Sequence, residues 1–224
     1  MQRKCYAVIV AGGSGSRMGG EIAKQFLMLG DKPILLHTIE AFLSLSFPVE
    51  IILVVPASLR DYWKNFYKEQ RLSFKHTLVS GGITRFHSVK NAMKYVPEGA
   101  LVAVHDGVRP FVSKDFLESL FAEAEEKRAV IPAVKVVDSL RYTDEEGSRP
   151  VERDKYVSIQ TPQIFHSELL LDAYSQAYNP AFTDDASVVE SGGTKIYLTE
   201  GRMVNIKITR PEDLTLAQAI LISF

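Results

Sequence analysis

Short apolar segments alternate with longer amphipathic segments along most of the 224-residue chain. Four runs rich in β-branched residues are nearly continuous in hydrophobicity, as expected of strands buried on both faces of a sheet. These runs are residues 6–10, 49–55, 101–105 and 129–134. Between them, apolar positions recur at helical spacing. The order predicts an α/β fold with a mostly parallel, Rossmann-like sheet flanked by helices.

Three helices are predicted from their apolar faces and capping residues. The first has apolar residues at positions 34, 35, 39, 42 and 43. The second has them at 116, 117, 120, 121 and 124, with Ser113 placed to cap the helix. The last begins with Thr209, Pro211 and Glu212, a capping-box arrangement with an early proline.

Residues 135–158 interrupt this alternation with a polar and charged segment. Two possible short strands, 136–142 and 151–158, flank a turn signal at 144–147. Because a structureless loop of this length is uncommon in a compact domain, a protruding β-hairpin arm is favoured over a loop. The length of the chain suits one domain, residues 1–224, with 135–158 as a dimerisation arm.

Composition and charge exclude several classes of protein. The 26 basic residues are offset by 27 acidic ones, so the basic excess of a nucleic-acid binder is missing. No run approaches the roughly 20 apolar residues that cross a bilayer, which predicts no membrane association. The single cysteine, Cys5, cannot form an intrachain disulfide and is predicted to be a small buried core residue. A reducing, cytoplasmic location fits best.

A glycine-rich loop at 11–20 follows the first predicted strand. In open α/β sheets ligands bind beyond the carboxyl ends of the strands, and glycines let backbone N–H groups approach phosphate oxygens. A Walker loop would need a lysine where Glu21 stands, and a dinucleotide-binding loop a glycine where Met18 stands. Arg17 and Lys24 could each be an ordinary surface cation, but together on this loop they are suited to be the fixed cations that nucleotidyl transfer requires around the attacked phosphorus.

Asp106 ends another apolar strand and is predicted to face the same crevice. It could hold Mg²⁺ or substrate hydroxyls, or it could cap a turn. Arg109 could be its salt-bridge partner, a ligand contact, or both.

Two further segments have weaker signals. Gly82 precedes a helical stretch at 84–95, where Arg85 or Ser88 could reach a nucleotide, although turn chemistry alone would explain the glycine. Residues 183–185 indicate first a helix N-cap with acids that complement the helix dipole. The five histidines show no metal-ligand spacing.

Motifs spread over the whole chain occur in a characteristic order. They are residues 11–19 with Lys24 and Gln25, then Gly81, Gly82, Arg85 and Ser88, then His105-Asp106 and Arg109-Pro110, then Gln160-Thr161-Pro162-Gln163 with Phe165, then residues 183–187, then residues 205–207 and 209–213. In this order they resemble the 2-C-methyl-D-erythritol 4-phosphate cytidylyltransferase family. The resemblance implies transfer of CMP from CTP to 2-C-methyl-D-erythritol 4-phosphate, with release of pyrophosphate, in the non-mevalonate isoprenoid pathway.

The resemblance also implies a role for particular residues. Catalytic roles fall to Arg17 and Lys24, which would steady the α-phosphate, and to Asp106. The cytidine nucleotide would be held by Ala11, Gly12, Gly13, Ser14, Gly15, Gly82, Arg85 and Ser88. The polyol phosphate would be held by Asp106, Arg109, Thr183 and Lys207. In a homodimer the arm would bring Ser139 and Arg153 to the neighbour's site. Mg²⁺ would be bound mainly through the CTP phosphates.

Two other functions remain open at this point. Ribitol 5-phosphate cytidylyltransferase has a similar glycine loop and differs in the alcohol pocket. A noncatalytic nucleotide-binding module would keep the loop but would not need Arg17, Lys24, Asp106 and Lys207 together. Relative to the family's pattern, five positions differ without removing a charge or donor used above: Gly12, Ala23, Gly107, Val108 and Ser139.

Overall fold

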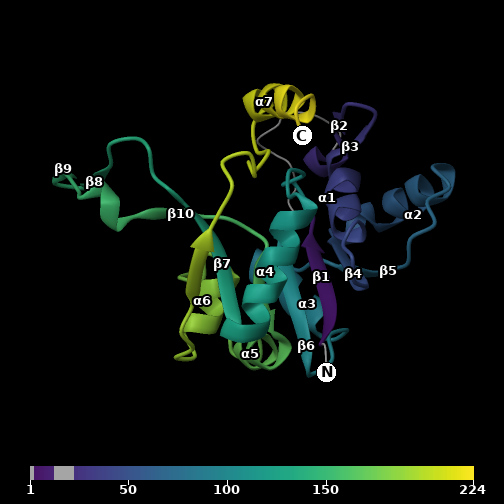
Figure 1. The fold of residues 1–224 in the computed structure, drawn as a ribbon, viewed down its shortest axis with the longest axis horizontal. Helices are drawn as coiled ribbons and strands as arrows, with labels where there is room; N and C mark the ends of the chain where they lie inside the picture. Colours follow the sequence, from purple (N-terminus) through teal and green to yellow (C-terminus); the bar gives the residue numbers. More distant parts are fainter. Residues whose placement is uncertain (1–2, 13–22) are drawn as a thin grey trace.

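The computed structural model describes residues 3–12 and 23–224. Within these ranges an eight-stranded sheet forms the centre of the molecule, with strand order β10-β7-β11-β6-β1-β4-β5 and β12 beside β7 (Figure 1). The strands are β1 (Lys4–Val10), β4 (Val49–Val55), β5 (His76–Ser80), β6 (Ala100–Asp106), β7 (Ala129–Lys135), β10 (Val157–Ile159), β11 (Gln163–His166) and β12 (Tyr197–Glu200).

The pairing of the strands confirms the mostly parallel sheet. β1 lies between β6 and β4 and runs parallel to both, and β5 extends the parallel set beyond β4. The four predicted strands correspond to β1, β4, β6 and β7. The antiparallel strand β11, inserted between β6 and β7, and the strand β12 were not predicted. β10 overlaps the end of the predicted strand 151–158, but it pairs with β7 and not within the arm.

The sheet reverses its direction of growth at β1. The chain passes from β1 through β4 to β5 on one side, and β6 then lies on the other side of β1. Segments leaving the carboxyl ends of β1 and β6 therefore diverge, which is where open α/β sheets bind ligands. The ends stay close together, since the N–H of Gly107 donates to the carbonyl of Val10 at 2.9 Å.

Helices pack on the sheet from both sides. They are α1 (Ile34–Leu43), α2 (Arg60–Glu69), α3 (Arg85–Met93), α4 (Lys114–Lys127), α5 (Ser167–Ala173) and α6 (Asp185–Glu190). The last helix, α7 (Pro211–Leu221), lies apart from the sheet, and its Ala217 packs in a separate cluster with Leu29 and Ile34 (Figure 1). No helix in the described ranges has the length and apolar character to span a membrane.

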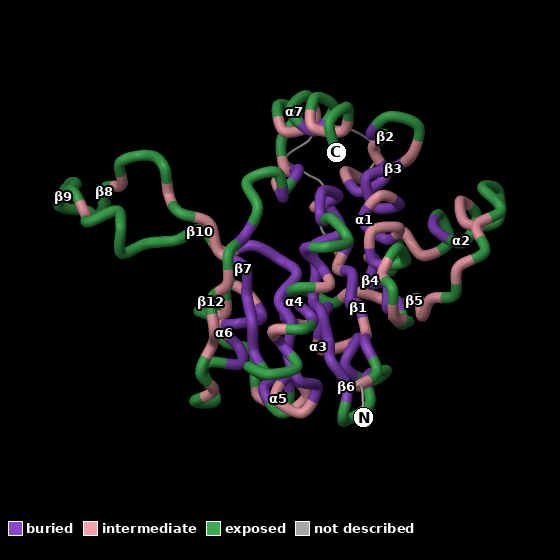
Figure 2. Tube along the Cα trace, in the orientation of Figure 1, coloured by how far each residue is buried: buried purple, intermediate pink, exposed green. Residues whose placement is uncertain are grey.

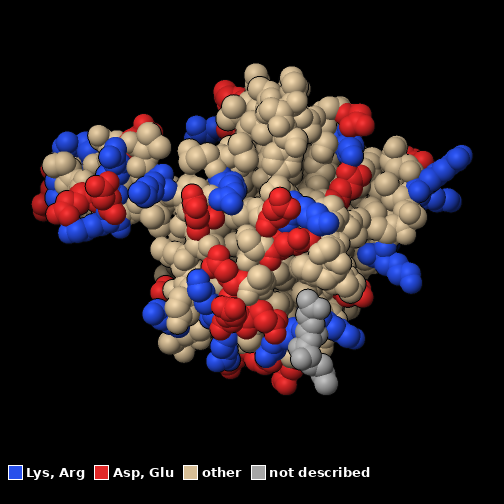
Figure 3. Space-filling view, in the orientation of Figure 1, with Lys and Arg blue, Asp and Glu red and all other residues tan. Residues whose placement is uncertain are grey.

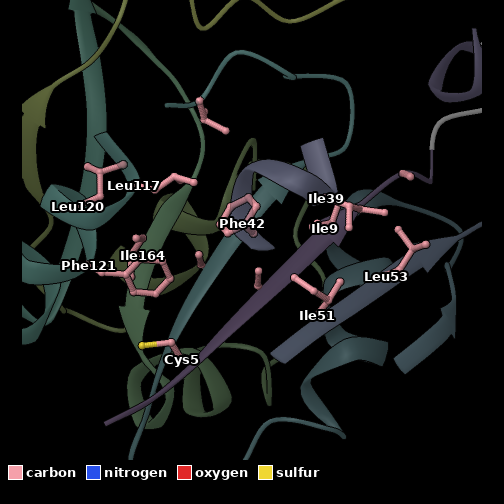
Figure 4. Packing of buried hydrophobic residues seen from close by; sticks show 14 of the residues in the cluster. Cys5, Ile9, Ile39, Phe42, Ile51, Leu53, Leu117, Leu120, Phe121 and Ile164 are labelled. Atoms are coloured by element: carbon pink, nitrogen blue, oxygen red, sulfur yellow. The ribbon is translucent and has the colours of Figure 1, made fainter. Parts of the chain in front are cut away.

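Successive residues of β1 point into two different cores, as the two-residue period of a strand requires. Ile9 packs with Phe42 of α1 and with apolar residues of α4, a cluster that Figure 4 shows from close by. Val8 joins the other cluster, with Val89 of α3. Cys5 lies at the edge of the first cluster, and burial together with Glu125 raises the pKa of its thiol to about 11. Its prediction as a core residue is confirmed.

The three predicted helices are present, with one change in capping. The hydroxyl of Ser113 accepts from the N–H of Phe116 at 3.4 Å, as predicted. At the last helix the predicted use of Glu212 is wrong. Asp213 makes the cap, its Oδ2 accepting from the backbone N–H groups of Thr209 at 2.7 Å and Arg210 at 2.9 Å. A carboxylate one position later reaches both donors.

The arm leaves the sheet after β7 and returns through β10 (Figure 1). Its hairpin consists of β8 (Arg141–Asp144) and β9 (Gly147–Pro150), both exposed (Figure 2). The predicted turn at 144–147 is confirmed. The predicted strands 136–142 and 151–158 are wrong in extent, because the hairpin pairs only residues 141–144 with 147–150, and residues 157–158 belong to β10. On the face drawn in Figure 3, acidic and basic side chains are interspersed on the arm.

Candidate active site

A pocket of about 510 Å³ opens at the carboxyl ends of β1 and β6. Ala11 and Gly12 follow β1, and Asp106 ends β6. The rest of the lining includes residues at the start of α3 and Lys207, which lies in the segment between β12 and α7. Its lining residues are Val10, Ala11, Gly12, Lys24, Gln25, Gly82, Ile83, Thr84, Arg85, Ser88, Asp106, Val108 and Lys207. Of the predicted nucleotide and catalytic residues, Gly13, Ser14, Gly15 and Arg17 lie outside the described ranges.

Among the described lining residues, cations outnumber acids. Three of the lining residues are basic, Lys24, Arg85 and Lys207, and one is acidic, Asp106. A chain with a net charge of −1 therefore concentrates positive charge at this pocket. Such an arrangement favours a small polyanion over a neutral ligand.

The turn at Gly82 is built by Ser88. The hydroxyl of Ser88 accepts from the N–H of Gly82 at 3.0 Å and donates to the carbonyl of Thr84 at 2.9 Å. A side chain at Gly82 would overlap the Cβ of His87. Glycine is thus required here by close approach of the backbone to α3, and Ser88 shapes the pocket wall in the structure rather than standing free in it.

Asp106 is the centre of a charged cluster. Its Oδ2 lies 2.9 Å from Nζ of Lys207 and 3.4 Å from Nε of Arg109, and its Oδ1 lies 3.4 Å from Nε of Arg85. Burial raises the pKa of the Asp106 carboxyl, but the positive charges of Arg85, Lys207 and Arg109 lower it by more than burial raises it. The pKa of Asp106 therefore lies well below its usual range. Asp106 is therefore ionised at neutral pH.

Arg85 is shared between two carboxylates. Its Nε faces Asp106, and its Nη2 donates to Oδ2 of Asp185 at 2.6 Å. Asp185 is fully buried and also accepts from the hydroxyl of Tyr174 at 2.6 Å. The sequence predicted Asp185 only as an acid at a helix start, where Asp184 does cap α6 by accepting from the N–H of Ser187 at 2.9 Å. The role of Asp185 in the cluster was missed.

Arg109 is held from both ends. Burial lowers the pKa of its guanidinium, with Asp106 opposing that shift. Its Nη1 donates to the carbonyl of Asn205 at 2.8 Å, and its own carbonyl lies 3.0 Å from Nε2 of His105. Because a carbonyl only accepts, Nε2 of His105 carries the hydrogen. Burial lowers the pKa of His105 to about 4, so the ring is neutral at pH 7.

A second pocket of about 280 Å³ adjoins the first. The two share Arg85, Asp106 and Lys207 as lining residues. The second adds Arg109 and Thr183, which places every predicted polyol-phosphate residue of the body of the chain on its wall. Its remaining lining residues are Ile159, Gln160, Thr161, Gln163 and Asp184.

Two amides that brace the second pocket had no predicted role. The side-chain N–H₂ of Asn205 donates to the carbonyl of Thr161 at 2.9 Å, and that of Gln160 donates to the carbonyl of Arg202 at 2.8 Å. Both side chains are buried. Both residues belong to the motifs that support the family resemblance. Their hydrogen bonds to distant backbone carbonyls could not be predicted, because such bonds leave no repeating pattern in a single sequence.

The predicted arm residues do not reach either pocket within the chain. Ser139 is exposed and precedes β8. Arg153 donates from Nη1 to the carbonyl of Val137 at 2.6 Å, a contact inside the arm. The arm extends away from the body that carries the pockets (Figure 1).

No group of three or more His, Cys, Asp or Glu side chains that could hold a metal is found in the described part of the chain. Asp106 is the one carboxylate that lines both pockets there, and its oxygens already face three cations. Asp106 could therefore supply one oxygen ligand to a divalent cation whose other ligands come from a bound phosphate compound.

Comparisons with known proteins agree with this geometry. Residues 5–223 match the family model described as 2-C-methyl-D-erythritol 4-phosphate cytidylyltransferase. A protein of that name from Bacteroides thetaiotaomicron is 50% identical over 214 residues, covering 96% of this chain and 98% of its own length. One from Porphyromonas gingivalis is 46% identical over 224 residues, covering both chains fully. The crystal structure of 4-diphosphocytidyl-2C-methyl-D-erythritol synthase from Anaerococcus prevotii is similar with a TM-score of 0.83 at 29% identity, covering 98% of this chain and 96% of that one.

Proposed function

The chain belongs to the 2-C-methyl-D-erythritol 4-phosphate cytidylyltransferase family, and we propose that its two adjoining pockets divide the two substrates between them. The protein transfers CMP from CTP to 2-C-methyl-D-erythritol 4-phosphate, a step of the non-mevalonate isoprenoid pathway. The products are 4-diphosphocytidyl-2-C-methyl-D-erythritol and pyrophosphate. The observation that carries the division is the shared wall of Arg85, Asp106 and Lys207.

CTP occupies the larger pocket. Ala11, Gly12 and Gly82 line it, although the N–H of Ala11 donates to the carbonyl of Val54 and that of Gly82 to Ser88. The nucleotide-binding residues 13–15 of the prediction continue the same glycine-rich loop, a type of sequence suited to binding phosphate through backbone N–H groups. Lys24 and Arg85 offset the charge of the triphosphate. Ser88 contributes by fixing the Gly82 turn.

The polyol phosphate occupies the smaller pocket. Lys207 and Arg109 meet its phosphate, while Thr183 and the Asp106 carboxylate are suited to its hydroxyl groups. An acceptor there has its phosphate beside the shared wall, next to the nucleotide. The two reacting groups are thus brought together by the geometry of the walls.

The chemical step is an in-line displacement. A phosphate oxygen of the acceptor forms a bond to the α-phosphorus of CTP as the bond to the leaving pyrophosphate oxygen breaks. The nucleophile is already an oxyanion at neutral pH, so the step needs neither a general base nor a covalent enzyme intermediate. Lys24, with Arg17 from the glycine loop, neutralises the charge on the α-phosphate, and this neutralisation is the main way in which fixed cations accelerate the step.

Mg²⁺ is the expected cofactor. It would be held mainly by triphosphate oxygens, with Asp106 as the described carboxylate nearest to both substrates. When bound, it offsets the charge that two anionic substrates bring together.

The arm completes the site of a second copy in this proposal. Within one chain Ser139 and Arg153 stand on a segment that projects from the body, and the exposed side chains of Val137 and Tyr156 flank them. An exposed hairpin with apolar side chains is suited to contact between copies. Ser139 and Arg153 then line the partner's acceptor pocket.

Pyrophosphate release tests the assignment directly. The protein is incubated with Mg²⁺, CTP and either 2-C-methyl-D-erythritol 4-phosphate or ribitol 5-phosphate, and the cytidine diphosphate product is identified by mass. Release with the first acceptor alone is expected. Release with ribitol 5-phosphate alone would move the chain to the ribitol enzyme, and nucleotide binding without release would make it a noncatalytic module.

A further inference from the structure

Among the described cations of the site, Arg85 is the one that pairs with two carboxylates. Its guanidinium touches Asp106 through Nε at 3.4 Å and Asp185 through Nη2 at 2.6 Å. Lys207, by contrast, reaches a single carboxylate and is less buried. The shorter contact of Arg85 is the one on the side away from Asp106, so the hold on Arg85 comes mainly from Asp185.

Asp185 is built to hold a cation. Its side chain has no exposed surface, and its two oxygens accept from different partners, Arg85 and the hydroxyl of Tyr174, each at 2.6 Å. Tyr174 is itself buried, and its ring stacks on Phe86, the residue next to Arg85, with centroids 4.9 Å apart. Burial raises the pKa of Tyr174 well above its usual value, with Asp185 adding to the shift, so its hydroxyl stays a donor.

A helix start does not explain this arrangement. An acid that complements a helix dipole acts from the surface, where it costs little to leave it charged. A buried carboxylate needs a partner, and a buried ion pair adds little stability over apolar residues of the same size. Here one end of the pair opens on the wall that both pockets share. The pair thus fixes the Arg85 guanidinium where the two substrates are proposed to meet.

Without the negative charge at Asp185, Arg85 has one carboxylate left to pair with. The guanidinium would close on Asp106, leaving the nucleotide pocket and occupying the carboxylate that faces the acceptor. We propose that Asp185, oriented by Tyr174, is a positioning residue that keeps Arg85 at the boundary between the nucleotide and acceptor pockets. This inference rests on the proposed function, since it takes the two pockets to hold the two substrates.

The Asp185→Asn variant of the full chain tests the inference through steady-state kinetics with CTP and 2-C-methyl-D-erythritol 4-phosphate. Asparagine keeps the size of the side chain and loses its charge. We expect kcat/KM to fall at least about tenfold for both substrates, because a displaced guanidinium disturbs both pockets. Tyr174→Phe, which leaves the ion pair, should lower kcat/KM by about threefold.

Tyr67→Phe is the matched control for Tyr174→Phe. The hydroxyl of Tyr67 donates to the carbonyl of Phe74 on α2's side of the molecule, and Tyr67 lines neither pocket. The Tyr67→Phe variant, like Tyr174→Phe, loses one hydrogen bond from a tyrosine hydroxyl. If that loss acts only on the structure, both variants have a lower melting temperature and an unchanged kcat/KM. That result overturns the inference.

A double-mutant cycle with Arg85→Met separates positioning from general damage. If Asp185 acts through Arg85, then Asp185→Asn should change kcat/KM by less than about twofold in the Arg85→Met background. An equal loss in both backgrounds contradicts the inference. If Arg85→Met does not fold, the Tyr174→Phe and Tyr67→Phe pair decides. A wild-type protein that releases no pyrophosphate refutes the proposed function, whereas an active wild type with unaffected Asp185→Asn and Tyr174→Phe variants refutes only the role of Asp185.

Discussion

Replacing His105 with glutamine should remove a specific part of the acid sensitivity of folding. His105 is fully buried, and its Nε2 donates to the carbonyl of Arg109. Burial lowers the pKa of its ring from 6.5 to about 4, with Asp106 opposing this shift and Arg109 and Arg85 adding to it. The Nε2 of glutamine can occupy the same donor position, but glutamine does not titrate.

The sign follows from the proton balance. Between pH 6.5 and pH 4 the unfolded chain binds a proton at His105 that the folded chain excludes, so the free energy of unfolding falls as the pH falls. The contribution is constant above about pH 7, and the two pKa values give a loss of about 2 kcal/mol by pH 5. The full loss below pH 4 is about 3 kcal/mol.

Urea unfolding at pH 7.5 and pH 5.0 measures the effect. The wild-type protein should lose about 2 kcal/mol more than His105→Gln over this interval. Other groups, including His76, whose pKa burial also lowers, contribute equally to both proteins and cancel in the difference. Parallel profiles would refute the burial argument, and a variant already destabilised at pH 7.5 would show that glutamine does not replace the hydrogen bond.

Three further outcomes follow from the site. Lys24→Ala should lower kcat by about a hundredfold while changing the KM for CTP much less, since the lysine is assigned to the transition state; a change in KM alone would contradict this. Gly82→Ala should lower the free energy of unfolding by about 1–3 kcal/mol and raise the KM for CTP, because the methyl overlaps His87, whereas Gly192→Ala, with only ordinary contacts, should do neither. Mixing the inactive variants Arg153→Ala and Lys24→Ala should restore about a quarter of wild-type activity if the arm acts on a partner's site, and none if it does not.

Strong local periodicity made four of the eight strands of the described sheet and three helices predictable. The run 49–55 matches β4 residue for residue, because an uninterrupted β-branched segment has few alternatives. β11 is only four residues long and is stabilised by its neighbours β6 and β7, which are distant in sequence. The arm strands were predicted too far from the turn, because exposed strands have no buried face whose apolar pattern would mark their ends.

The site was predictable as a set of charges but not as a network. Asp106, Arg109 and Lys207 could be grouped because strand ends and motifs indicated one crevice, and the structure brings them together around Asp106. The partner of Arg85 could not be found in this way. Asp185 is 100 residues away, at the start of a six-residue helix where an acid already has an ordinary explanation.

The network also explains how an ionised carboxylate can take part in binding an anion. In the described cluster, the Asp106 carboxylate pairs with both Lys207 and Arg109 and holds these two cations in place. In the proposed substrate assignment, an acceptor phosphate competes for the same two cations, and each contact that it gains loosens one that Asp106 had. The carboxylate oxygens released in this way become acceptors for the hydroxyl groups of the same substrate. Arg85 cannot follow the phosphate because Asp185 holds it, so one cation stays at the boundary with the nucleotide. If the polyol phosphate binds as proposed, it redistributes charge within the smaller pocket while the shared wall keeps its geometry.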